Sequence, residues 1–91
     1  LTMAAQFELA ILTPERSVFE GRVEHVEVPG VVGYLGVLAH HAAFVTPLAA
    51  GTLTVRRPGG EEVCWRVSGG FFQVSGDRAT VLADEASAEP A

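Results

Sequence analysis

The fold is decided by residues 52–68, which read TLTVRRPGGEEVCWRVS. On both sides of the Pro-Gly-Gly turn, apolar side chains alternate with polar ones, and the apolar positions are Leu53, Val55, Val63, Trp65 and Val67. Alternation with a period of two is typical of half-buried strands, and Pro followed by Gly favours a tight turn. This stretch therefore predicts a β-hairpin.

Shorter segments with the same character lie on either side of the hairpin, at residues 7–12, 17–21, 22–28, 71–74 and 78–83. Within 22–28, Val23 differs in parity from Val26 and Val28, so we expect a bulge or break near Glu24-His25. No stretch has a convincing helical period. About nine short strands separated by Gly and Pro predict an all-β fold, and the clean alternation favours a β-sandwich of two packed sheets, antiparallel or mixed.

Composition excludes several classes of function. The chain has 91 residues, a single domain's length, with a formal net charge of −5. It lacks the basic footprint of a nucleic-acid binder, and an anionic membrane surface would repel it. The single cysteine, Cys64, cannot form an intrachain disulfide, and no apolar run approaches the ~20 residues that cross a bilayer. The expected compartment is the cytoplasm.

The chain divides into three parts by composition. Residues 1–5 are expected to be a disordered or cloning-derived N-terminus, with Met3 as the candidate natural start. Residues 6–84 are expected to form the β-sandwich domain. Residues 85–91 are acidic and small, and they predict a tail or linker.

Residues 30–47 stand apart because they hold three of the ten glycines and two of the three histidines and are almost uncharged. If His40 and His41 lie on a strand, they point to opposite faces and cannot easily share a metal ion. The spacing of Gly30, Gly33 and Gly36 resembles a phosphate loop only faintly, because no lysine and no helix pattern accompanies it. What remains is an uncharged, glycine-spaced loop on a β-scaffold, which is typical of a docking surface.

A serine beside two glycines, Ser68-Gly69-Gly70, is the other candidate for chemistry. A hydrolase would need Ser68 within about 3 Å of His40 or His41. The surrounding sequence is not a nucleophile elbow, so a bend at the glycines is the preferred interpretation. Composition and pattern alone leave a docking module, a stand-alone adaptor and a small hydrolase as alternatives.

Six segments in order along the chain resemble one family, the N-terminal domain of the ATP synthase epsilon subunit. They are residues 24–30, 33–38, 41–48, 51–55, 67–74 and 80–84. No single segment is decisive, but the ordered series is specific. This resemblance implies a β-sandwich of about ten strands, without the C-terminal helical pair that often follows in the family and binds ATP in some bacteria.

The resemblance also implies a non-catalytic subunit of the rotor stalk that needs no metal and no cofactor. Its implied partners are the gamma subunit, the membrane c-ring and the rest of the complex, with no nucleic acid and no direct membrane insertion. The implied c-ring contacts are Val31, Val32, Gly33, Tyr34 and Leu35. The implied gamma-subunit contacts are His41, Ala42, Ala43 and Phe44. Such a subunit would couple proton or sodium flow to ATP synthesis on the cytoplasmic face of the bacterial inner membrane, as a peripheral component.

Two departures from the family pattern affect these contacts. Where the family usually has acidic residues facing the ring, this chain has Val32 and Tyr34. We therefore expect an apolar or stacking contact in place of an ionic one. The family usually reads Pro-Gly-His before Ala, whereas this chain reads Ala39-His40-His41. His41 therefore matches the family histidine, and His40 is an extra one.

Overall fold

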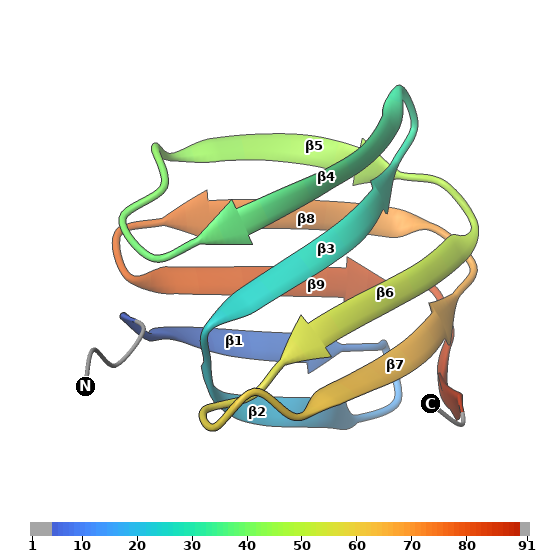
Figure 1. Cartoon of the computed structure of the whole chain (residues 1–91). Coiled ribbons are helices and arrows are strands. Elements are labelled where there is room, and N and C mark those ends of the chain that lie inside the picture. The colour runs from blue at the N-terminus through green and yellow to red at the C-terminus, as the bar shows by residue number, and fades with distance from the viewer. Residues whose placement is uncertain (1–4, 90–91) are drawn as a thin grey trace.

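A computed structural model describes residues 5–89 as ten β-strands with no helix (Figure 1). In chain order, the strands are β1 (Phe7–Leu12), β2 (Ser17–Val23), β3 (His25–Gly30), β4 (Gly33–Leu38), β5 (Phe44–Leu48), β6 (Gly51–Arg56), β7 (Glu62–Val67), β8 (Gly70–Ser75), β9 (Arg78–Ala83) and β10 (Ala86–Glu89). The all-β prediction is confirmed.

Nine strands form one continuous hydrogen-bonded path that folds over into two layers, and β4 pairs with β3 off this path (Figure 1). One layer runs β4-β3-β6-β7-β10, and the other runs β5-β8-β9-β1-β2. Pairing is antiparallel except between β1 and β9, which are parallel. The chain passes between the layers at five connections, which are Glu24, residues 39–43, residues 49–50, residues 68–69 and residues 84–85. The predicted break near Glu24-His25 is the first of these corners.

The core lies between the two layers and contains the side chains that alternation predicts to point inward. These include Phe7, Leu9, Ile11, Leu53, Val55, Trp65 and Val67, all of which are buried. Within the described residues, no polar or charged side chain is buried. The core is therefore held by apolar burial, which contributes roughly 1.5–3 kcal/mol for each large aliphatic or aromatic side chain.

Two predicted irregular regions are ordered strands instead. Most of the glycine-spaced segment 30–47 forms β4 and β5, because β4 pairs with β3 along its whole length and β5 pairs with β8. Within the predicted tail, Ala86–Glu89 forms β10 against β7. Backbone pairing at a sheet edge needs no hydrophobic stripe, which explains why composition suggested a linker there. Residues 1–4 and 90–91 of the predicted termini lie outside the described residues.

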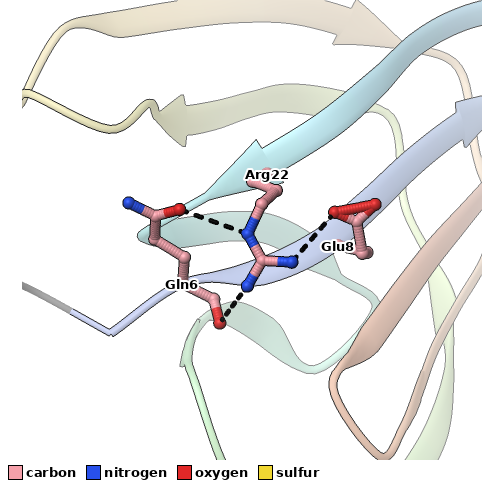
Figure 2. A network of polar contacts seen from close by, with 3 residues as sticks. All are labelled: Gln6, Glu8 and Arg22. Atoms are coloured by element: carbon pink, nitrogen blue, oxygen red, sulfur yellow. Dashed lines mark hydrogen bonds and ion pairs between the residues drawn. The ribbon is translucent and has the colours of Figure 1, made fainter.

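The start of β1 is held to β2 by Arg22 (Figure 2). Its guanidinium donates to the side-chain Oε1 and the backbone carbonyl oxygen of Gln6, at 3.2 and 3.3 Å, and pairs with Glu8 Oε2 at 3.3 Å. The Arg22 and Glu8 side chains are 56% and 43% exposed. Solvent screening limits such a pair to about 0–1 kcal/mol, so the cluster fixes the register of the chain end more than it stabilises the fold.

Candidate docking surfaces

The β3–β4 hairpin projects beyond the rest of the sandwich and carries the residues predicted to contact the ring (Figure 1). Gly30 pairs with Gly33, and Val31 and Val32 form the turn between them. Val32 is 91% exposed and Val31 is 54% exposed. The tip therefore offers apolar side chains and no charge.

Tyr34 and Leu35, the two remaining residues of the predicted ring contact, lie at the start of β4. Both make contacts within this chain. Leu35 is half-buried against the core. Tyr34 is 57% exposed, and its hydroxyl accepts a hydrogen bond from the Thr52 backbone N–H at 3.1 Å. The free apolar surface of the tip is thus centred on the two valines.

The segment predicted to contact gamma connects β4 to β5 at one end of the sandwich. His41, Ala42 and Ala43 are exposed there. Phe44 is half-buried, with its ring 5.8 Å from that of the core residue Phe72 and 4.9 Å from that of His41. Phe44 therefore closes the end of the core, and His41 covers it.

The two adjacent histidines lie in this connection and not on a strand, which corrects the premise of the opposite-face argument. His40 has a positive φ of 66°, and its Nδ1 lies 3.8 Å from Asp77 Oδ1 in the β8–β9 turn. His41 Nδ1 lies 2.8 Å from the Ala42 carbonyl oxygen. Across residues 5–89, no group of three or more His, Cys, Asp or Glu side chains is placed to hold a metal ion.

The structure separates Ser68 from both histidines and so removes the hydrolase alternative. Ser68 precedes β8, whereas His40 lies beside Asp77, just beyond the other end of β8. The strand has six residues, a separation of about 20 Å. Ser68 lines a hollow of about 590 Å³ with Arg16, Arg66 and other residues, none of them histidine within the described chain.

A third surface was not predicted: the outer side of the layer that contains β5, β8, β9 and β1. Strand pairing places Pro47 beside Phe71, Phe71 beside Leu82, and Leu82 beside Leu12. A second row of paired residues runs next to the first, consisting of Val45, Gln73, Thr80 and Ala10. We call these eight residues the uncharged face.

The uncharged face is both apolar and accessible. Val45, Phe71 and Leu82 are 63%, 55% and 48% exposed. Phe71, Leu82 and Leu12 also line a shallow hollow of about 370 Å³. Contiguous exposed apolar surface of this kind is typical of a protein interaction site.

The outer side of the other layer differs in charge. Its paired rows include Arg56 with Glu62 on β6 and β7, and Arg66 on β7. Glu27 on β3 and Glu89 on β10 add further charge to that side. Charged residues border the uncharged face on its own layer, at Glu8, Glu20 and Arg78. The eight paired residues themselves contain no charge, so this patch suits an apolar partner surface.

A signal for the uncharged face was present in the sequence. Phe71 and Phe72 are adjacent on a strand, so one ring must point away from the core. Phe72 is fully buried and Phe71 is the exposed one. The neighbours of Phe71 on the surface come from β5, β9 and β1, and their pairing could not be read from local patterns.

Comparison with known families gives one match that covers nearly the whole chain. Residues 6–89 match the model described as "ATP synthase, Delta/Epsilon chain, beta-sandwich domain". The ATP synthase epsilon chain of Moorella thermoacetica is 46% identical over 82 residues, which is 90% of this chain and 61% of that protein. The sodium ion specific epsilon chain of Propionigenium modestum is 40% identical over 82 residues, which is 90% of this chain and 59% of that protein. This chain therefore spans less than two thirds of the length of these relatives.

Solved structures show the same architecture. A chain in the cryo-EM structure of the Euglena gracilis mitochondrial ATP synthase, OSCP/F1/c-ring in rotational state 1, superposes with a TM-score of 0.88 at 28% identity, covering 97% of this chain and 56% of that one. A chain in the central stalk and c-ring structure of the Tetrahymena thermophila mitochondrial ATP synthase superposes with a TM-score of 0.75 at 14% identity, covering 94% and 69%. The second likeness supports the fold alone.

Proposed function

Because this chain belongs to the ATP synthase delta/epsilon β-sandwich family, we propose that it is a non-catalytic rotor-stalk component that docks the gamma subunit to the membrane c-ring. It would act mechanically, by keeping ring rotation coupled to ATP synthesis, and would need no cofactor. No observation favours a stand-alone adaptor over this role.

The observation that carries the proposal is the uncharged face. Phe71 and Leu82 are paired on neighbouring strands and are about half exposed, at 55% and 48%. Burying them on a partner would contribute roughly 25 cal/mol for each Å² of apolar surface removed from water. We propose that gamma covers this face together with His41, Ala42 and Ala43, and that Phe44 supports the segment from below.

The tip of the β3–β4 hairpin is the proposed contact with the c-ring. Val31 and Val32 would make an apolar contact, with Gly33 allowing close approach and with Tyr34 and Leu35 fixing the base of the hairpin. The tip adjoins the β5 end of the uncharged face, where the Val31 N–H donates to the Pro47 carbonyl oxygen at 3.3 Å. Because the tip extends beyond the sandwich (Figure 1), the ring and gamma could bind at the same time as neighbours.

The proposed place of work is the cytoplasmic face of the bacterial inner membrane, with the chain attached only through its partners. No helix long and apolar enough to cross a membrane occurs within the described residues. We propose a proton or a sodium ion as the coupled ion, since the relatives include a chain named as sodium ion specific.

Cysteine mapping in the assembled ATP synthase tests both contacts at once. In a Cys64→Ser background, Val32→Cys should form an oxidative cross-link to a c subunit carrying loop cysteines. Phe71→Cys should cross-link to gamma with a short bifunctional reagent. Glu62→Cys, on the charged outer side, is the matched control and should cross-link to neither. If Val32→Cys and Phe71→Cys behave like Glu62→Cys, the proposed docking role is wrong.

A further inference from the structure

We infer that the free edge of β4 is a strand-addition site, which takes an extended, uncharged segment of the stalk partner as a further strand. Among the described residues, β4 pairs only with β3, and no other backbone hydrogen bond reaches Gly33–Leu38. Alternate residues of a strand at a sheet edge direct their N–H and C=O groups away from the sheet. β4 therefore presents a row of unpaired backbone groups.

The other three edges of the sandwich carry the features that normally prevent strand addition. β2 contains Glu20 and Arg22, and its pairing with β1 is irregular at Ile11/Leu12. β10 has only four residues and ends in Glu89. β5 contains Pro47, which has no N–H to donate. These edges are blunted by charge and irregular pairing, by short length and by proline.

None of these features occurs in β4. Its sequence, GYLGVL, has no charge and no proline, and all six residues pair with β3 without a shift in register. Leu38, near the end of the strand, is 57% exposed. An uncharged edge of this length with regular pairing invites further pairing unless a partner normally covers it.

The position of β4 favours the gamma subunit as the source of the added strand, so the inference rests on the proposed function. β4 begins at Gly33, within the proposed ring contact, and ends at Leu38, shortly before the proposed gamma segment at His41. A strand added along this edge would join two surfaces that the same stalk must hold together. Main-chain hydrogen bonds would supply affinity, and Leu38 would supply a side-chain contact.

The test uses backbone amide exchange of this chain, alone and with its cognate gamma subunit. We expect amides in Gly33–Leu38 that exchange quickly in the free chain to slow by about tenfold or more in the complex. The variant Leu38→Lys, which places a charge on the edge, should weaken gamma binding by about tenfold or more. Ser87→Lys, on the exposed edge strand β10, is the matched control and should change binding by less than about twofold. Unchanged exchange in the cores of both variants would show that they fold.

The outcomes separate the inference from the proposed function. If gamma binds but β4 exchange is unchanged, the strand-addition site is wrong while the docking role stands. If Leu38→Lys and Ser87→Lys bind gamma equally, the inference is again wrong. If the free chain forms a concentration-dependent dimer that protects β4, the edge serves a second copy and not gamma. If folded gamma does not bind at all, both proposals fail.

Discussion

The phenolic oxygen of Tyr34 accepts a hydrogen bond from the backbone N–H of Thr52, at 3.1 Å. Pairing between β3 and β6 ends at Glu27 with Thr54, so the Thr52 N–H lies just beyond the ladder on that side. The tyrosine supplies the missing acceptor and ties the base of the projecting hairpin to β6. The main role of Tyr34 is therefore to hold the hairpin that carries the proposed c-ring contact, and its exposed surface is secondary.

Replacing Tyr34 with Phe should remove this hydrogen bond and leave the aromatic side chain in place. We expect the free energy of unfolding to fall by about 0.5–1.5 kcal/mol, because one backbone donor loses its partner. Chemical denaturation measures the loss. Exchange of the Thr52 amide should accelerate in the folded state, and an unchanged Thr52 exchange rate would contradict the role assigned to the hydroxyl.

Gly51 is required because two groups approach it closely. A Cβ at this position would lie 2.7 Å from the Tyr34 hydroxyl oxygen and 2.7 Å from Pro29 Cβ. Gly51→Ala should therefore lower the free energy of unfolding by about 1–3 kcal/mol, the usual cost of overpacking. Gly21→Ala is the control, since its Cβ would meet only Phe19 at an ordinary 3.5 Å. Equal effects of the two substitutions on denaturation would contradict the close-approach argument.

His40 occupies a backbone conformation that favours glycine, with φ at 66°. The left-handed conformation costs a residue with a side chain roughly 1–2 kcal/mol. Glycine avoids this cost but loses more backbone entropy on folding, so the net gain is smaller. We expect His40→Gly to raise the free energy of unfolding by about 0.5 kcal/mol. His41→Gly should lower it, because its φ is not in the positive range and its ring packs against Phe44. A destabilised His40→Gly would show that the contact with Asp77 outweighs the strain.

The apolar tip predicts that coupling depends little on salt. Raising ionic strength from about 0.1 M to about 1 M shortens the screening length from about 10 Å to about 3 Å, which weakens exposed ionic contacts but not apolar ones. Ion pumping driven by ATP should therefore persist in the assembled enzyme at high salt. Val32→Asp, which restores a charge at the tip, should make pumping sensitive to salt. A steep loss of pumping with the unaltered chain would contradict an apolar ring contact.

The alternation of side chains was enough to predict most of the fold. The hairpin of β6 and β7, the buried positions of β1 and the corner at Glu24 follow from period-two patterns and turn residues. β4 escaped prediction because Gly33 and Gly36 interrupt its pattern and its exposed positions are apolar. β10 escaped because its stability comes from backbone pairing with β7.

The docking surfaces were predictable only where they are continuous in the chain. The tip at Val31 and Val32 is a local feature, and its lack of charge is visible in the sequence. The uncharged face combines Leu12, Phe71 and Leu82 from three strands, and the parallel pairing of β1 with β9 brings Leu12 to it. No local pattern encodes that pairing.

The central claim is that gamma covers the uncharged face, and a calorimetric titration of this chain with its cognate gamma subunit tests it most directly. We predict saturable one-to-one binding with a negative heat-capacity change, the mark of apolar burial. Phe71→Glu should weaken that binding by about 100-fold without changing the circular dichroism spectrum, because it places an unpaired charge in the contact. Glu62→Gln should bind like the unaltered chain. Absence of binding to folded gamma, or equal binding by Phe71→Glu, would contradict the account.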